Sequence, residues 1–251
     1  MTGTDLVVLQ GIRKDYPQGK LTVPALRGID LTVKSGEFTA IAGPSGSGKT
    51  TMLNLIGCLD RPTAGRILLD GQELTSLSKN QLAAVRRQSI GFIFQTFNLI
   101  PVLTALENVE LALTLLREVP AAEVRDRAMK VLAEVGLAGL EGRRPGELSG
   151  GQQQRVAIAR ALVKEPKVVL ADEPTANLDS ENGEAVLHLM LEMNQTKGTT
   201  FIFSTHDPRV MRHARRLVTM RDGQIVGDER RNGQTAEEER YHAAEGGGAD
   251  A

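Results

Sequence analysis

A glycine-rich octapeptide at residues 43–50 constrains the fold of this chain more than any other feature. It reads Gly43-Pro44-Ser45-Gly46-Ser47-Gly48-Lys49-Thr50 and stands between an expected strand at residues 38–42 and an expected helical run at 51–59. Glycines let the backbone curl so that N–H groups point inward at phosphate oxygens, and the following helix N-terminus adds positive partial charge. The octapeptide therefore predicts a phosphate-binding loop; the alternative is a turn that only caps the helix.

Side chains of this loop extend the prediction from a phosphate to a nucleotide. Lys49 is expected to meet the β- and γ-phosphates, and the Thr50 hydroxyl to bind Mg²⁺, which prefers hard oxygen ligands. The expected nucleotide-binding residues in this stretch are Gly43, Pro44, Ser45, Gly46, Ser47, Gly48, Lys49, Thr50 and Thr51.

An apolar run that ends in two acids forms the second motif. Residues 167–171 are followed by Asp172, Glu173 and Pro174. In P-loop NTPases such an acid holds Mg²⁺ through water, which we expect of Asp172. Glu173 is then free to orient and deprotonate an attacking water beside the γ-phosphate. An acidic pair at a strand end is common and is usually only solvated. This motif indicates a catalytic site only together with the phosphate-binding loop that precedes it in the sequence.

Runs rich in β-forming residues alternate with helical stretches, which predicts an α/β sheet that is at least partly parallel. The expected strands lie at residues 38–42, 89–94, 167–171 and 200–204. Two alternating segments precede them and indicate an antiparallel sheet that flanks the nucleotide. These segments are residues 6–12 and 26–33, with turn signals at 16–20 and 34–37.

Between Gln95 and Leu148 the pattern turns helical, with expected helices at residues 105–117 and 121–135. We expect an inserted helical subdomain at roughly residues 96–162. From residue 227 onward the chain has almost nothing apolar and cannot bury enough surface to order itself. The sequence therefore predicts one domain over residues 1–226 and a disordered tail over 227–251.

Charge and hydropathy argue against several kinds of partner. Thirty Lys and Arg against 31 Asp and Glu give a net charge of -1, which indicates neither nucleic-acid binding nor direct lipid insertion. The apolar windows are far shorter than the roughly 18 residues of a spanning helix, and no secretory signal is evident. The single cysteine, Cys58, is expected to be a buried, inert thiol. We expect a cytoplasmic protein whose membrane contact goes through other proteins.

The third motif is Leu148-Ser149-Gly150-Gly151-Gln152-Gln153-Gln154-Arg155, which opens an expected helix at residues 152–162 with Ser149 as N-cap. It resembles the signature sequence of ABC (ATP-binding cassette) ATPases. In that family two copies face each other head to tail, and the signature of one closes over the γ-phosphate held by the other. The resemblance therefore implies a homodimer with two composite sites. The residues expected to act in trans are Ser149, Gly150, Gly151, Gln152 and Asp179.

Further residues resemble family elements in the family's order along the chain. Gln95 resembles the Q-loop glutamine, which implies that it ligates Mg²⁺ and links hydrolysis to the helical subdomain. Asn177-Leu178-Asp179 resembles the D-loop, in which Asp179 would sense the opposite site. Tyr16 matches the aromatic residue that stacks on adenine; the alternative is a tyrosine that packs a hairpin turn.

His206, in Ser204-Thr205-His206-Asp207, resembles the switch histidine of the family. The resemblance implies that His206 contacts the γ-phosphate and helps hold the water that Glu173 activates, which makes these two the expected catalytic residues. It implies an ATPase with ATP and Mg²⁺ that forms ADP and phosphate. The implied fold is an α/β P-loop NTPase of the ABC ATPase type, with a mixed or parallel core sheet, an N-terminal antiparallel β subdomain and an inserted helical subdomain.

Four segments look like one bacterial branch of the family, namely residues 16–19, 23–28, 53–62 and 91–99. That branch holds the lipoprotein-releasing and macrolide-exporter ATPases and a cell-division relative. It implies an ATPase on the inner face of the inner membrane whose ATP-dependent dimerisation drives separate integral-membrane permease subunits. The branch implies a mechanotransmission mechanism, in which ATP-driven closure of the dimer moves the permease. This motion would serve lipoprotein release or the export of drugs or peptides.

Permease contact is expected near residues 95–103, where four apolar side chains could receive a short coupling helix. They are Phe97, Leu99, Ile100 and Leu103. The alternative is that these residues simply pack the helical subdomain against the core.

Three other functions compete with this interpretation. Soluble ABC ATPases that act on DNA or ribosomes carry two cassettes or long insertions, whereas here each motif occurs once and Gln95 and Leu148 lie too close for an insertion. A P-loop kinase would have no use for Glu173, the signature or His206. An ATP-gated regulatory clamp on a membrane partner, as in the cell-division relative, remains an open alternative.

Overall fold

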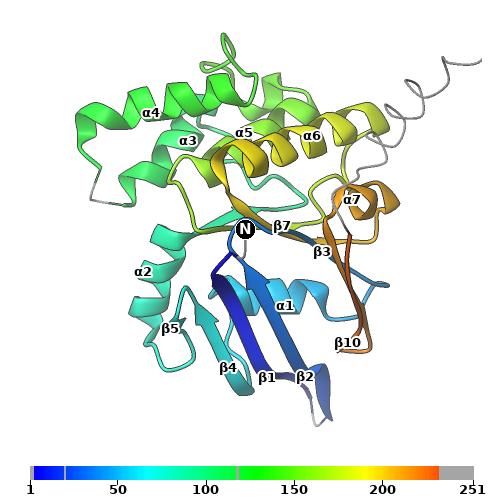
Figure 1. The fold of residues 1–251 in the computed structure, drawn as a ribbon. Coiled ribbons are helices and arrows are strands. Elements are labelled where there is room, and N and C mark those ends of the chain that lie inside the picture. Colours follow the sequence, from blue (N-terminus) through cyan, green and yellow to red (C-terminus); the bar gives the residue numbers. More distant parts are fainter. Residues whose placement is uncertain (1–2, 20, 117–118, 232–251) are drawn as a thin grey trace, which may run out of the picture.

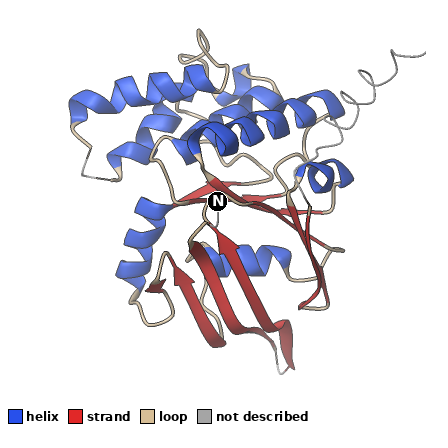
Figure 2. Ribbon diagram, viewed as in Figure 1, coloured by secondary structure: helices blue, strands red, loops and turns tan. Residues whose placement is uncertain are grey.

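Two sheets and a layer of helices make up the chain in a computed structural model, which describes residues 3–19, 21–116 and 119–231. A six-stranded sheet runs through the middle (Figures 1 and 2). Helices α3 to α6 cover one of its faces, and helix α1 and a four-stranded sheet cover the other. The fold is therefore α/β with separate antiparallel and helical parts, as predicted.

The six-stranded sheet is mixed, in the order β10-β9-β3-β8-β7-β6. Strands β3, β6, β7, β8 and β9 pair in parallel, and β10 is antiparallel to β9. Their bounds are β3 Phe38–Ala42, β6 Ile90–Ile93, β7 Val168–Asp172, β8 Thr200–Thr205, β9 Arg216–Arg221 and β10 Gln224–Arg230. Four of these strands match the expected runs, and β9 and β10 were not expected.

The second sheet is antiparallel, in the order β2-β1-β4-β5. Its strands are β1 Asp5–Gln18, β2 Leu21–Lys34, β4 Ala64–Leu69 and β5 Gln72–Glu73. The turn expected at residues 16–20 is wrong for Tyr16 to Gln18, which continue β1. Pro17 fits in β1 because β4 pairs with β1 only as far as Arg13, which leaves a free edge beyond it. Pro24 fits in β2 because β2 is the edge strand of this sheet.

Helices occupy three places around the sheets. Helix α1 lies between them, and α2 lies beside β6 (Figure 1). Helices α3, α4, the short helix η1 and α5 form the helical subdomain. Helix α6 packs against α5 and α7, and α7 packs against β3. Their bounds are α1 Lys49–Ile56, α2 Lys79–Ser89, α3 Ala105–Thr114, α4 Ala121–Glu134, η1 Pro145–Glu147, α5 Gly150–Leu162, α6 Ser180–Lys197 and α7 Pro208–His213.

Local sequence explains where these helices begin. Thr104 caps α3 and Ser149 caps α5, each in a capping box with the Glu or Gln three residues later. Asp179 caps α6, and Gly198 ends it in the left-handed region at φ +66°. The predicted N-cap role of Ser149 is confirmed.

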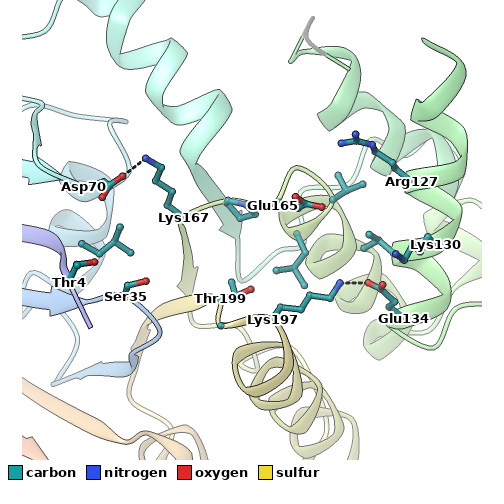
Figure 3. Close-up of a pocket in the computed structure, with 16 residues that line it drawn as sticks. Thr4, Ser35, Asp70, Arg127, Lys130, Glu134, Glu165, Lys167, Lys197 and Thr199 are labelled. Atoms are coloured by element: carbon teal, nitrogen blue, oxygen red, sulfur yellow. Dashed lines mark hydrogen bonds and ion pairs between the residues drawn. The ribbon is translucent and has the colours of Figure 1, made fainter. Parts of the chain in front are cut away.

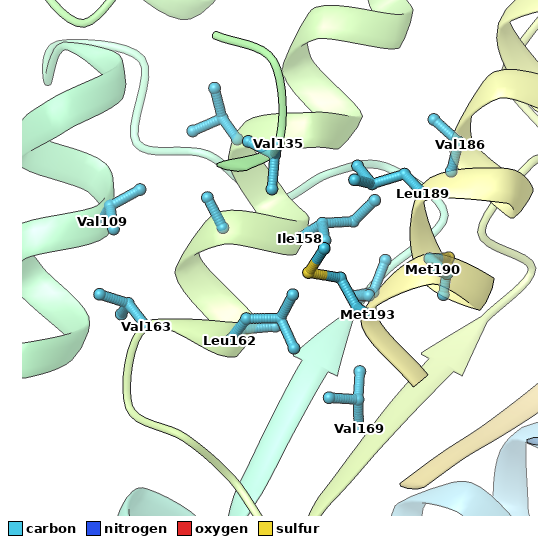
Figure 4. Packing of buried hydrophobic residues seen from close by; sticks show 14 of the residues in the cluster. Val109, Val135, Ile158, Leu162, Val163, Val169, Val186, Leu189, Met190 and Met193 are labelled. Atoms are coloured by element: carbon cyan, nitrogen blue, oxygen red, sulfur yellow. The ribbon is translucent and has the colours of Figure 1, made fainter. Parts of the chain in front are cut away.

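Alternate residues of the central strands pack into two separate cores. Val169 and Phe201 face the helices, where they join side chains of α5 and α6 such as Ile158 and Met190 (Figure 4). Val168 and Ile202 face α1 and the antiparallel sheet. A parallel strand buried on both faces must be apolar at every position, which explains the continuous apolar runs seen in the sequence.

The expected tail needs one correction. Residues 227–230 belong to β10, where Asp228 pairs with the buried Arg216 of β9 at 2.7 Å. A buried guanidinium holds this edge strand in place, so the strand needs few apolar residues. The polar composition from residue 227 onward therefore wrongly indicated that the tail starts there. Residues 232–251 lie outside the described part of the chain. Among the described residues, no helix is long and apolar enough to cross a membrane.

Candidate nucleotide-binding site

Loops that follow β3, β6, β7 and β8 meet at one edge of the six-stranded sheet and line a cavity of about 610 Å³. Parallel strands end at the same edge, so segments that are distant in the sequence come together there. The cavity is lined by Ala25, residues 44–51, Gln95, Glu173 and His206. Of the expected nucleotide-binding residues, only Tyr16, Gly43 and Asp172 do not line it.

The glycine-rich loop wraps around the ammonium of Lys49. This buried Nζ donates to the carbonyl oxygens of Gly43, at 2.8 Å, and Pro44, at 3.0 Å. Gly48 has φ +100°, and a Cβ there would lie 2.7 Å from the oxygen of Ala25, so the position requires glycine. Helix α1 starts without a side-chain cap, which leaves its first N–H groups for a ligand.

Thr50 and Asp172 bring two hard oxygen ligands together. Thr50 Oγ1 donates to Asp172 Oδ1 at 3.0 Å, and the hydroxyl of Ser204 donates to the same carboxylate oxygen. Ser204 was not among the expected site residues. Its position two residues before His206 was a signal in the sequence, but its contact with Asp172 follows from the register of β7 and β8, in which these two residues are partners.

Glu173 and His206 form a pair in the cavity. The distance from His206 Nδ1 to Glu173 Oε1 is 2.7 Å, and the Glu173 side chain is 15% exposed against 71% for His206. Glu173 has φ +49°, a left-handed conformation that costs a non-glycine residue about 1–3 kcal/mol. Its backbone N–H donates to the oxygen of Ser204 at 3.0 Å, which holds the carboxylate in this strained direction.

The expected Q-loop and D-loop residues lie against each other. Asn177 Nδ2 donates to the carbonyl oxygen of Gln95 at 2.9 Å, and Gln95 itself lines the cavity. Asp179 lies outside the cavity at the start of α6. Two hydrogen bonds from Asn182 hold the pKa of Asp179 below its ordinary value. The larger effect comes from the backbone N–H of Asn182 and the smaller from its side chain.

Ser149 to Gln152 lie apart from the cavity. Gln152 N donates to Ser149 Oγ at 3.3 Å, and Ser149 N donates to Gln152 Oε1 at 2.9 Å. Gly151 packs so closely against α6 that a Cβ would lie 2.4 Å from Asn182 Oδ1. None of the residues expected to act in trans contributes to the cavity of its own chain.

Tyr16 is also outside the cavity lining. Its hydroxyl donates to Asp60 Oδ2 at 2.8 Å, and the Lys14 ammonium lies 4.7 Å from the ring centre. The ring is partly exposed. Asp60 therefore fixes the hydroxyl end of a ring that stands at the edge of the antiparallel sheet.

Comparison with known proteins decides the family. The family model described as ABC transporter matches residues 26–176. The chain belongs to the ABC transporter family. It is an ABC ATPase, and the matched region contains the glycine-rich loop, the signature and the Asp172–Glu173 pair. The family and the fold inferred from these motifs are confirmed.

Three proteins illustrate how this ABC ATPase relates to others. The lipoprotein-releasing system ATP-binding protein LolD of Anaeromyxobacter dehalogenans is 49% identical, over 90% of this chain and 94% of that protein. The macrolide export ATP-binding/permease protein MacB 1/2 of Paracoccus denitrificans is 48% identical over 91% of this chain. The ATP-binding cassette MJ0796, solved as a dimer in a post-hydrolysis state with ADP and Pi, is 45% identical with a TM-score of 0.84, over 91% of this chain and 100% of that one.

Coverage differs between these relatives. The chain spans about a third of the length of the macrolide export relatives, 34% in Paracoccus denitrificans and 31% in Syntrophobacter fumaroxidans. Those proteins are named as an ATP-binding part and a permease in one chain.

The ABC ATPase site fits a nucleotide with Mg²⁺. Among the described residues, the buried Ser47 Oγ in the glycine-rich loop has no hydrogen-bond partner, although buried polar atoms are rarely left unpaired. A phosphate oxygen bound in the loop would give this hydroxyl a hydrogen-bond partner. The oxygens of Thr50 and Asp172, 3.0 Å apart, are the hard donors that Mg²⁺ prefers.

A second cavity, of about 500 Å³, lies between the core and the helical subdomain of the ABC ATPase; we call it the basic groove. Its lining residues are Leu59, Ala83, Arg86, Arg87, Phe92, Phe94, Asn98, Ala112, Leu115, Arg160, Ala161 and Lys164. None of the four expected docking residues, Phe97, Leu99, Ile100 and Leu103, lines it. Leu99 instead packs on the helical core, and Arg160 donates to the carbonyl oxygens of Phe97 and Asn98.

A larger cavity, of about 810 Å³, contains none of the nucleotide motifs (Figure 3). It lies where β7 and β8 begin, at the opposite edge of the sheet from Lys49. Ion pairs join Lys167 to Asp70 and Lys197 to Glu134 across its wall. Size is thus a poor guide to the chemistry of this protein, because the motif residues meet in the smaller cavity.

Proposed function

We propose that this chain is the ATP-hydrolysing subunit of a bacterial ABC transporter, which acts as a homodimer and drives separate permease subunits. The observation that carries this proposal is the pairing of Glu173 with His206 in the cavity that also contains Lys49. A site that only senses a nucleotide needs no carboxylate beside the γ-phosphate. In this proposal the ATPase is a single domain that contains the helical subdomain and ends with β10.

Binding of ATP begins at the glycine-rich loop. The N-terminus of α1 and the Lys49 ammonium neutralise the β- and γ-phosphates, with Lys49 exchanging its carbonyl partners for phosphate oxygens. Residues 43–51 surround the phosphates, and Tyr16 stacks on the adenine. The partial exposure of Tyr16 supports stacking, because one end of the ring is fixed while the ring stays accessible.

Thr50 and Gln95 would hold Mg²⁺ directly, and Asp172 would hold it through water. Bound there, the ion would supply positive charge against the negative charge that develops on the phosphate oxygens during transfer. Ser204 keeps the Asp172 carboxylate directed at this position through its hydroxyl.

Hydrolysis uses Glu173 and His206. The Glu173 carboxylate accepts a proton from the water that attacks the γ-phosphate, and its strained backbone fixes the direction of approach. His206 holds the carboxylate and contacts the γ-phosphate. A general base of this kind contributes about 10²- to 10⁴-fold to the rate.

Dimerisation completes the site. Ser149, Gly150, Gly151, Gln152 and Asp179 of one copy face the γ-phosphate held by the other. Two features support this arrangement: the helix N-terminus at Ser149 lies outside the cavity of its own chain, and the related cassette MJ0796 is described as dimeric. Because both copies present the same surfaces, closure creates two equivalent sites.

The permease docks in the basic groove. Phe92, Phe94 and Leu115 offer apolar surface, and Arg86 and Lys164 place positive charge beside it. We expect the docking segment to be a short helix with apolar and acidic residues. Attachment is thus through protein, on the inner face of the bacterial inner membrane, and the cargo is a lipoprotein or an exported drug or peptide.

A two-part experiment tests this function. ATP hydrolysis with Mg²⁺ is measured for the purified chain and for Lys49→Ala. Native membranes that contain the permease, taken from cells without this chain, are tested for binding of wild type and Arg86→Glu. Hydrolysis lost only in Lys49→Ala, with membrane binding lost only in Arg86→Glu, supports the proposal. A wild type that binds membranes without hydrolysing ATP, even when bound, would instead indicate the regulatory clamp.

A further inference from the structure

Three potential metal ligands meet where α6 packs beside α7, away from the nucleotide cavity. Glu184 and His188 are one helical turn apart on α6, so their side chains share a face of that helix. His213 is the last residue of α7. Two of the four histidines of the whole sequence are therefore gathered at one point with a carboxylate.

The distances suit one small cation. His213 Nε2 lies 2.5 Å from Glu184 Oε1, and His188 Nε2 lies 3.7 Å from the same oxygen. One ligand atom from each residue lies within 4.8 Å of the other two. In tetrahedral zinc coordination, with bonds of about 2.0–2.1 Å, ligand atoms stand about 3.3 Å apart. These two distances, 2.5 and 3.7 Å, bracket that value, so shifts of less than about 1 Å would close the site.

The cluster combines one buried ligand, which the fold holds in place, with two partly exposed ligands, which solvent can reach. The His213 side chain is 10% exposed, whereas those of Glu184 and His188 are 36% and 43% exposed. The rings of His188 and His213 lie edge to face, with centroids 5.2 Å apart. The Nε2 atom of each ring lies near the same oxygen, Glu184 Oε1. Arg209 interacts electrostatically with Glu184, and its guanidinium is engaged by Asp207 through Nε and Nη2.

We propose that Glu184, His188 and His213 form a Zn²⁺ site that links α6 to α7. Two imidazoles and one carboxylate suit zinc rather than Mg²⁺ or Ca²⁺, which prefer oxygen ligands. Water occupies the fourth position on the exposed side. The ion joins the helix that begins at Asp179 to the helix that follows His206, and so fixes the relative position of two segments of the nucleotide site.

The test titrates Zn²⁺ into the full chain, purified without a polyhistidine tag and without nucleotide, by calorimetry. Wild type is expected to bind one Zn²⁺ per chain and to melt at a higher temperature with zinc than with a chelator. His188→Ala changes a half-exposed position and should fold normally. It is expected to weaken zinc binding by about tenfold or more, since even loss of a group that only supports a ligand costs that much.

Two further variants make the result specific. Glu184→Gln keeps the size of the side chain but removes its charge, and is expected to weaken binding as His188→Ala does. His206→Ala is the control, because the His206–Glu173 pair is the other place among the described residues where a histidine and a carboxylate meet; it should bind zinc as wild type does. Cobalt should give the intense visible absorption of tetrahedral coordination. Equal zinc affinity in wild type, His188→Ala and Glu184→Gln, or no stoichiometric binding to wild type, would overturn the proposal.

Discussion

The imidazole of His206 lies 2.7 Å from the carboxylate of Glu173, at the ends of two neighbouring parallel strands. The carboxylate is mostly buried, whereas the histidine is mostly exposed. The buried partner is therefore the one whose position the fold determines, through its bond to Ser204 and its unusual backbone. In the proposed function, the exposed His206 is the partner that contacts the γ-phosphate.

Replacement of Tyr16 tests adenine stacking. Tyr16→Ala should weaken ATP binding by about 5- to 150-fold, because stacking of an aromatic ring on a base contributes about 1–3 kcal/mol. Tyr16→Phe is the matched control, since it keeps the ring and loses only the hydroxyl with its hydrogen bonds to Asp60 and Thr51. Calorimetric titration with ATP in the absence of Mg²⁺ measures both. Equal affinity of Tyr16→Ala and wild type would show that the ring only packs the ribbon.

Replacement of Ser149 tests the site formed in trans. Ser149→Arg should leave ATP binding by the single chain unchanged, because Ser149 lies outside the cavity, but should reduce hydrolysis at least about 100-fold by blocking closure. Its lost cap costs about 1 kcal/mol of stability. Ser78→Arg removes the same kind of capping box from α2 and should keep its activity. An active Ser149→Arg would contradict the composite site.

Lys164 should give the stability a specific pH dependence. Burial, and then the positive charge of Arg86, lowers the pKa of Lys164 from 10.5 to about 8. Between these values the unfolded chain binds a proton that the folded chain does not, so stability from this group increases as pH rises from about 8 to 10.5 and is lost as pH falls through 8.

Urea unfolding of wild type and Lys164→Met at pH 7, 9 and 10.5 checks this sign. Wild type should gain stability relative to Lys164→Met as the pH rises. A difference that stays constant with pH would mean that the amine, which donates to the carbonyl oxygens of Arg86 and Arg87, titrates like an exposed lysine.

Arg216 should be essential for the last two strands. Its buried guanidinium donates to Glu37 Oε2 at 2.8 Å and to both oxygens of Asp228, which raises the pKa of Arg216 above its ordinary value. Arg216→Met removes the charge that faces the mostly buried Glu37 carboxylate. It should lower the free energy of unfolding in urea by about 3 kcal/mol. The exposed neighbour gives the control, since Arg215→Met should change stability by less than about 0.5 kcal/mol. Similar values for both variants would refute the role of this network.

Sequence predicted those parts of the fold that local chemistry determines. The strand before Gly43 and the helix cap at Ser149 were found because a glycine-rich turn and a capping box are local signals. Strand β10 was missed because its stability depends on an ion pair between Arg216 of β9 and Asp228 of β10. The polar residues of β10, taken without β9, are typical of a disordered tail.

The candidate site was predictable in its residues but not in its contacts. Lys49, Glu173 and His206 were identified from motifs, and the structure brings them into one cavity. Ser204 was missed because its role depends on register between β7 and β8. The four residues expected to receive the permease do not line the basic groove. The sequence near Phe97 is apolar, but the orientation of that loop depends on Arg160, which donates to the carbonyl oxygen of Phe97. The predicted inert thiol agrees with the structure, where burial raises the pKa of Cys58 to about 11.

The central claim is that Glu173 is the base in a site completed by a second copy. Its most direct test is Glu173→Gln, which keeps the shape of the side chain but cannot accept the proton. ATP hydrolysis is measured for wild type and the variant, and the variant is passed through size-exclusion chromatography with ATP and Mg²⁺. The account predicts that hydrolysis falls by about 10²-fold or more and that the variant elutes as a dimer only when ATP is present. A Glu173→Gln protein that hydrolyses ATP at the wild-type rate and remains monomeric with ATP would contradict it.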